Sequence, residues 1–430
     1  MEKTFWNSLD VPSGVRLNHL LSRVSEPDKD IIDFSLTEPL HKPPSFVVEE
    51  YKKYAPTIGK AINGAGGFGG LRELRGTIFS WAKARHAVKS KTFTENNIIA
   101  TNGGSEAIFS AIQILAEGKR EGYIVLPNPA DPIYETAGRI AGLEPIYCST
   151  MTSQQPTYRD LSEEQWAEVK VLVVNSPADP NGADLPVLTW EFLLKQSEEY
   201  GFCILSDERL NSIHRGKPPP GLLEMADSND NPDMNRCVVV NDLTFRSNLA
   251  GMPSGFLAGD REFIKKANIY RAYHGLYIPV PNQKAAKLAW EDEDHVIENN
   301  KKYAGKFKDA PKRCNTSLPA SDSLYGHYLW IRVPGDDIAF AVTAYGRTGV
   351  KVMPGQLLGK KTGNVNPAIG MVRIALIHNP GVCAAGLLEL CKMVNPKHRS
   401  QTMVAVAAPD EVLRQHAHLD DSTAPLGMPL

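Results

Sequence analysis

Short apolar runs alternate with amphipathic stretches over the first two thirds of the chain. The runs at 98–100, 123–126, 169–174, 203–206 and 237–241 are predicted strands, and 106–115 and 188–200 have helical spacing. Apolar runs without polar alternation suit strands that are covered on both faces. The pattern therefore predicts an α/β fold with a mostly parallel sheet between helices. Because ligands bind at the carboxyl ends of such strands, the residues after each run are candidates for function.

The pattern changes near residue 293, where a smaller α+β unit is predicted. Residues 295–307 are expected to form a long polar helix, and 328–333 and 372–377 to form strands. The segment after 394 is rich in Ala, Pro and Asp, and it predicts one helix at 410–418 and a mobile end. The expected boundaries are 1–45 for an N-terminal arm with part of the small domain, 46–292 for the large domain, 293–395 for the small C-terminal domain and 396–430 for a C-terminal extension.

Composition and charge favour a large soluble enzyme. The 430 residues carry 47 Lys and Arg against 49 Asp and Glu, so the net charge of −2 offers no excess positive charge to nucleic acid. No apolar run approaches the roughly 20 residues that a bilayer span needs, and the first residues lead into no secretory signal. Six cysteines without a CxxC pair favour free thiols, so we expect a cytoplasmic protein.

A glycine-rich segment at 63–70 contains the spacing G-x-G-x-x-G. In dinucleotide-binding proteins this motif follows a buried strand and opens a helix. A helix is predicted after it, at 71–85, but the preceding Ala55-Pro-Thr-Ile is not an apolar strand. We therefore expect a flexible loop whose backbone approaches another group closely, and not a nucleotide site.

Motifs spread along the chain match one known family. They include Asp33-Phe-Ser-Leu-Thr-Glu-Pro39, Gly70-Leu-Arg-Glu-Leu-Arg75, Thr101-Asn-Gly-Gly-Ser-Glu-Ala107, Ser176-Pro-Ala-Asp-Pro-Asn-Gly182, Ser206-Asp-Glu208, Arg246-Ser-Asn-Leu-Ala-Gly251 and Val372-Arg-Ile-Ala375. Through them the chain from about 30 to 395 resembles the class I and II aminotransferases, which are fold-type I pyridoxal-phosphate enzymes. It is most similar to the N-succinyldiaminopimelate aminotransferase branch. The resemblance implies a large domain with a seven-stranded, mostly parallel sheet and a smaller α+β domain.

The resemblance also reveals departures at positions that hold the family's cofactor. Phe245 stands where the family's lysine forms a Schiff base, and a phenyl ring cannot form an imine. Asp242 replaces a serine that contacts the cofactor phosphate, and Pro253 replaces an arginine that grips it. A phosphate site with these residues has lost a cation and gained an anion. We count Gly103 and Gly104 with these degenerate cofactor positions.

Other positions of the same site either differ from the family's residue or keep it. Asp131 replaces the family's ring-stacking aromatic residue, Asp179 an asparagine that contacts the ring hydroxyl, and Leu210 a tyrosine. Asp207 survives where the family's aspartate pairs with the pyridinium nitrogen. Arg373 survives where its arginine clamps the substrate α-carboxylate.

Four aspartates are thus expected around one cleft: Asp131, Asp179, Asp207 and Asp242. Carboxylates this close repel one another unless a cation joins them. Three interpretations stay open, namely caps of helices and turns, a cationic substrate group, or a hard metal such as Mg²⁺ or Mn²⁺. The four are the candidate catalytic residues and metal ligands, and His41 is an acid–base candidate near neutral pH.

The substrate side of the site is predicted from the residues at its rim. The expected substrate-binding residues are Arg373, Thr37, Glu38, Asn102, Phe245 and Leu210. We expect a small amino-acid-like molecule with its carboxylate on Arg373 and its cationic part among the aspartates.

Three functions remain open from the sequence. The first is a cofactor-independent enzyme of specialised metabolism on an aminotransferase fold, which is not a functional transaminase. The second is an inactive homologue that serves as a regulatory or structural partner subunit, and the third is a non-covalent binder of pyridoxal phosphate. No cofactor is expected, with a divalent metal as the alternative. The expected assembly is a homodimer, or a heterodimer with an active paralogue.

Overall fold

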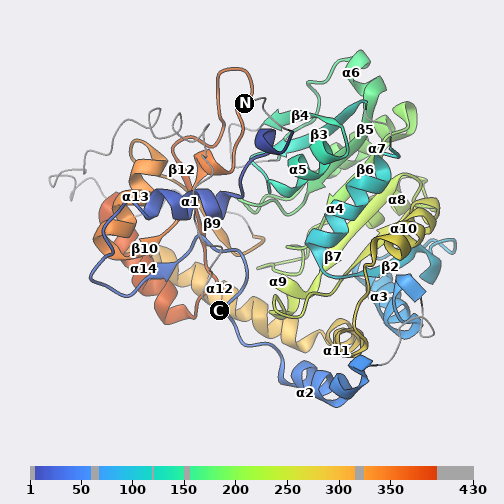
Figure 1. Cartoon of the computed structure of the whole chain (residues 1–430), viewed down its shortest axis with the longest axis horizontal. Coiled ribbons are helices and arrows are strands. Elements are labelled where there is room, and N and C mark those ends of the chain that lie inside the picture. The colour runs from blue at the N-terminus through green and yellow to red at the C-terminus, as the bar shows by residue number, and fades with distance from the viewer. Residues whose placement is uncertain (1–4, 60–66, 119–120, 150–154, 315–323, 395–430) are drawn as a thin grey trace.

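The computed structural model describes residues 5–59, 67–118, 121–149, 155–314 and 324–394 (Figure 1). The predicted helix at 410–418 and the first part of the glycine-rich segment lie outside these residues. The last glycines of that segment form a short turn, Gly67–Gly69, directly before helix α3 (Arg72–Arg85).

A seven-stranded sheet with the order β2-β8-β7-β6-β5-β3-β4 forms the centre of the larger unit (Figure 1). Its strands are β2 (Ile98–Thr101), β3 (Tyr123–Asn128), β4 (Glu144–Ser149), β5 (Val169–Asn175), β6 (Cys203–Asp207), β7 (Cys237–Asp242) and β8 (Gly255–Gly259). Strand β8 is antiparallel to both of its neighbours, and the other pairs are parallel. The predicted α/β fold with a mostly parallel sheet is therefore confirmed.

Helices cover both faces of this sheet, because successive side chains of a strand point to opposite sides. In β7, Val238 and Val240 join one apolar core, and Cys237 and Val239 join another. The first core includes α4 (Gly104–Leu115), α5 (Ile133–Ile140) and α10 (Arg261–His274). The second includes α2 (Ser45–Tyr54), α3, α6 (Glu163–Glu168), α7 (Val187–Tyr200), α8 (Leu222–Ser228), α9 (Leu243–Ser247) and α11 (Val280–Glu291). Burial on both faces explains why the strands lack polar alternation.

A smaller unit lies beside the larger one (Figure 1). It contains an antiparallel sheet of β9 (Tyr328–Arg332), β11 (Met353–Pro354) and β12 (Met371–Ala375), and the parallel pair β1 (Ile32–Asp33) and β10 (Val350–Lys351). Its helices are α1 (Ser13–Leu21), α12 (Asp294–Cys314), α13 (Asp337–Thr348) and α14 (Pro380–Val394). Helix α12 extends beyond the predicted 295–307. The exact domain boundaries stay a prediction.

Two observations bear on the expected environment of the protein. Among the described residues, no helix is both long and apolar enough to cross a membrane. Cys391 is disulfide-bonded, whereas Cys148, Cys203, Cys237 and Cys383 are free. The expectation that every thiol is free is therefore wrong for Cys391.

Candidate functional site

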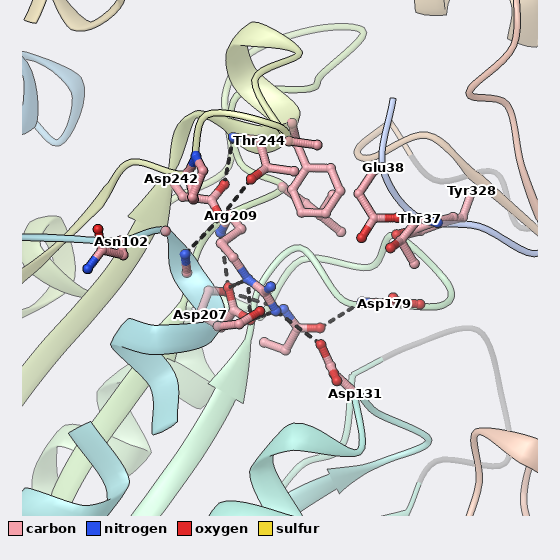
Figure 2. A pocket seen from close by; sticks show the side chains of 18 residues that line it. Thr37, Glu38, Asn102, Asp131, Asp179, Asp207, Arg209, Asp242, Thr244 and Tyr328 are labelled. Atoms are coloured by element: carbon pink, nitrogen blue, oxygen red, sulfur yellow. Dashed lines mark hydrogen bonds and ion pairs between the residues drawn. The ribbon is translucent and has the colours of Figure 1, made fainter. Parts of the chain in front are cut away.

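A cavity of about 290 Å³ opens where strands β5, β6 and β7 end beside the amino end of α4 (Figure 2). The last residues of these strands, Asn175, Asp207 and Asp242, line it, as expected for a ligand site in a parallel sheet. The predicted site residues that line it are Thr37, Glu38, Asn102, Gly103, Gly104, Asp131, Asp179, Asp207, Leu210, Asp242, Phe245 and Pro253. Arg373 and His41 are not among the lining residues.

The floor of the cavity holds an arginine that was not predicted from the sequence. Arg209 Nε donates to both carboxylate oxygens of Asp207 at 3.0 Å, and Nη2 donates to Asp207 Oδ2 at 2.7 Å and to Asp131 Oδ2 at 3.2 Å (Figure 2). Burial opposes the charged guanidinium, but Asp207 raises the pKa of Arg209 above its ordinary value. The Tyr134 hydroxyl also donates to Asp207 Oδ2, at 2.6 Å. Arg209 lies two residues after the end of strand β6, and this position could have identified it from the sequence.

The amino end of α4 is occupied by another carboxylate of the chain. Asp242 Oδ2 accepts from the Gly104 backbone N–H at 3.0 Å and from Thr244 Oγ1 at 3.2 Å, and Asp242 Oδ1 accepts from the Thr244 N–H at 3.0 Å. Asp242 therefore caps α9 and receives a free N–H of α4, and burial raises the pKa of its carboxyl. A Cβ atom at Gly104 would lie 2.2 Å from Cδ of Arg209, so only glycine fits this position.

Arg373 is paired inside the protein. Its Nη1 donates to Oδ1 and Oδ2 of Asp179 at 2.8 and 2.7 Å, and its Nη2 donates to the Ser35 carbonyl at 3.0 Å. Burial disfavours the charge, but Asp179 holds the pKa of Arg373 above its ordinary value. The guanidinium also lies 4.8 Å from the centre of the Tyr328 ring. This ion pair joins β12 of the smaller unit to the loop after β5 of the larger one.

The acid–base role predicted for His41 does not agree with its place in the structure. His41 lies outside the cavity, with Nε2 at 2.7 Å from Nζ of Lys306 and its ring 5.2 Å from that of Tyr303. Burial, together with Lys306, lowers the pKa of His41 to about 4. His41 is therefore neutral near pH 7 and has no contact with the cavity.

The partners of the four aspartates separate the three interpretations left open above. Asp242 is a helix cap, and Asp131, Asp179 and Asp207 contact arginines of the chain itself. Within the described ranges, no group of three or more His, Cys, Asp or Glu side chains could hold a metal ion. The geometry therefore favours capping and internal ion pairs over the predicted metal site.

Comparison with known proteins gives matches over most of the chain. Residues 29–379 match the family model described as aminotransferase class I and II. The chain is similar to the LL-diaminopimelate aminotransferase of Aquifex aeolicus, at 24% identity over 71% of this chain and 77% of that relative. It is also similar to the 4-dedimethylamino-4-oxo-anhydrotetracycline transaminase of Streptomyces rimosus, at 25% identity over 82% and 92%. The crystal structure of an aminotransferase from Neisseria meningitidis aligns with this chain with a TM-score of 0.84 at 30% identity. The alignment covers 91% of this chain and 100% of that structure.

These matches correct two predictions made from the sequence. The relatives are named as aminotransferases, so the predicted loss of pyridoxal-phosphate chemistry is wrong. This correction covers the predicted cofactor-independent enzyme and its alternatives, an inactive partner subunit and a non-covalent binder of pyridoxal phosphate. The prediction that no cofactor is needed is wrong for the same reason, because the family points to pyridoxal phosphate.

The residues of the cavity fit this cofactor only in part. The buried carboxylate of Asp207 suits a pyridine nitrogen, and the amino end of α4 suits a phosphate group. Phe245 offers no amine for a covalent link, and the Asp242 carboxylate receives the Gly104 N–H that a phosphate would use. Arg209 covers the Asp207 carboxylate. These side chains do not fit a cofactor held covalently at position 245.

Proposed function

The chain belongs to the class I and II aminotransferase family, and from this we propose that it acts on a small amino acid in the cavity between its two units. Transfer of the amino group, with pyridoxal phosphate as the family's cofactor, is the proposed reaction. The observation that carries the proposal is a pair of buried charges, one from each sheet. Asp207 of the seven-stranded sheet lines the cavity, and Arg373 of the three-stranded sheet pairs with Asp179, which also lines it. A cavity of about 290 Å³ suits a small molecule.

Each charge has a proposed role that its chemistry supports. The guanidinium of Arg373 can bind a substrate carboxylate once the Asp179 side chain has moved away from it. Asp207, which accepts from Tyr134, would hold a protonated ring nitrogen only if Arg209 moved off its carboxylate. The cofactor, when bound, supplies the electron-accepting ring that amino transfer requires. Phe245, Leu210 and Tyr328 provide the apolar surface against which a substrate side chain can pack.

We further propose that the protein is a homodimer in the cytoplasm. The support is the family to which the chain belongs, in which symmetric dimers are the rule. Size-exclusion chromatography with light scattering tests the assembly. A monomer at all concentrations would contradict it.

The proposed activity is tested with the full-length protein and added pyridoxal phosphate. Cofactor binding is followed by absorbance in the visible range, and amino transfer by coupled assays with a panel of amino acids and 2-oxo acids. We expect binding and turnover in the wild type, and loss of turnover with retained cofactor binding in Arg373→Gln. Arg332→Gln is the matched control, because Arg332 is exposed on the same sheet. No spectral change and no turnover with any substrate would overturn the proposal.

A further inference from the structure

Arg209 occupies the carboxylate that a cationic ring nitrogen would use. Its Nε lies 3.0 Å from each carboxylate oxygen of Asp207, and its Nη2 lies 2.7 Å from Asp207 Oδ2. The Tyr134 hydroxyl donates to the same Oδ2 at 2.6 Å. A cation that enters the cavity can therefore pair with Asp207 only after the Arg209 side chain has moved.

A second carboxylate already contacts the same guanidinium. Arg209 Nη2 donates to Asp131 Oδ2 at 3.2 Å (Figure 2). The other oxygen of Asp131 accepts from the Ile133 backbone N–H at 3.1 Å, so Asp131 is held in place without the help of Arg209. Its side chain is 33% exposed and lines the cavity. Asp131 is thus available to pair with the whole guanidinium.

Two other carboxylates that line the cavity have partners of their own. Asp179 pairs with an arginine of the smaller unit, and Asp242 caps a helix. Asp131 is therefore the carboxylate best placed to receive Arg209 when another cation takes Asp207. Without it, the displaced guanidinium would lie beside the new cation, and a buried charge without a partner is costly.

The side chain of Arg209 can move while its backbone stays in place. The Arg209 backbone N–H donates to Asp207 Oδ1 at 3.1 Å, and this contact does not involve the guanidinium. Gly104 leaves space for the stem of the side chain, because a Cβ atom there would lie 2.2 Å from Arg209 Cδ. Rotation between staggered side-chain positions needs no change of the backbone. The guanidinium can therefore shift from Asp207 to Asp131.

We propose that Arg209 is a gating residue with two positions. On Asp207 it closes the binding position of a cationic ring nitrogen, and on Asp131 it leaves that position open. The inference rests on the proposed function, because it takes Asp207 as the partner of the ring nitrogen of the family's cofactor. With the position open, the ring nitrogen pairs with Asp207 and the guanidinium with Asp131, so each cation has its own carboxylate. A ligand without such a nitrogen gains nothing from the movement of Arg209.

The test measures the binding of pyridoxine 5′-phosphate to the full-length protein, after dialysis, by isothermal titration calorimetry. This probe carries the ring nitrogen and the phosphate, but it has no aldehyde that could react with lysines. Arg209→Gln frees Asp207, so we expect this variant to bind the probe at least about tenfold more tightly than the wild type. Benzyl phosphate carries a ring and a phosphate without the nitrogen, and Arg209→Gln should not bind it more tightly than the wild type does.

Asp131→Asn tests the second position of Arg209. The amide oxygen keeps the contact with the Ile133 N–H, but the variant offers no negative charge to the guanidinium. We expect probe binding at least about fivefold weaker than in the wild type, and a change below about twofold when Asp131→Asn is added to Arg209→Gln. A general effect of charge would weaken binding equally in both backgrounds. Asp184→Asn is the control, because Asp184 lies in the loop after β5 and does not line the cavity.

The outcomes separate this inference from the proposed function. Equal probe affinity in the wild type and Arg209→Gln, or equal losses from Asp131→Asn in both backgrounds, overturns the gating role and leaves the proposed function intact. Absence of probe binding to the wild type and to every variant overturns the proposed function, and the inference with it. If Arg209→Gln does not fold, as judged by circular dichroism, Asp131→Asn decides. Probe binding weaker than in Asp184→Asn then supports the gating role, and equal binding overturns it.

Discussion

Arg209→Gln should destabilise the protein, because it removes the guanidinium that neutralises a fully buried carboxylate. Asp207 is 0% exposed and receives Arg209 Nε at 3.0 Å on each oxygen and Nη2 at 2.7 Å. Loss of one partner of a buried ion pair costs about 3–5 kcal/mol. The Tyr134 hydroxyl stays in place and offsets about 1 kcal/mol of this loss. We therefore expect the free energy of unfolding to fall by about 2–4 kcal/mol at neutral pH.

The assay is urea unfolding of the variant and the wild type at neutral pH. Arg209→Lys keeps a positive charge and should recover part of the loss. Arg332→Gln, at an exposed position, should stay within about 0.5 kcal/mol of the wild type. A loss below about 1 kcal/mol at neutral pH would refute the reasoning.

Two further predictions concern Glu208 and Gly104. Burial raises the pKa of Glu208 from 4.5 to about 7, so the folded protein retains this proton and loses stability as the pH rises through that interval. In the wild type, the free energy of unfolding should fall by about 3 kcal/mol between pH 4.5 and pH 7 because of Glu208, and Glu208→Gln should remove this fall. Urea unfolding across this pH interval measures it, and an equal dependence on pH in variant and wild type would contradict the prediction. Gly104→Ala should cost about 1–3 kcal/mol, because its Cβ meets Arg209 at 2.2 Å. A thermal unfolding scan measures the loss of stability. Gly14→Ala is the control, because a Cβ atom at Gly14 meets nothing within 4 Å, and equal losses of stability in the two variants would count against overpacking at Gly104.

Much of the fold could be predicted from local patterns. Unbroken apolar runs such as 169–174 and 237–241 identify buried strands, because both faces of each strand are covered. The end of α12 could not be predicted. Its apolar stripe ends at Phe307, and the residues that follow up to Cys314 are mostly polar, so the stripe does not mark where the helix stops.

The site was predicted less completely, because pairing depends on contacts between distant residues. The resemblance identified Asp207, Asp242 and Arg373 as positions of the site. The strand pattern predicted only the edge of the sheet at which Asp207 and Asp242 lie. Neither could reveal that Asp179, 194 residues earlier, is the anion that Arg373 holds in the structure. Arg209 was missed because each position of the site was compared with the family separately. Its role depends on two carboxylates at once, Asp131 and Asp207.

The close approach of Arg209 to Gly104 also constrains how related sequences can vary. A side chain at 104 and a long side chain at 209 compete for the same space, since the added Cβ would lie 2.2 Å from Cδ of Arg209. The two positions should therefore change together, with glycine at 104 wherever 209 is long. A larger residue at 104 also needs a change at Asp242, whose Oδ2 would lie 2.8 Å from the added Cβ. A mutational path to this cavity has an order: glycine at 104 must come before arginine at 209.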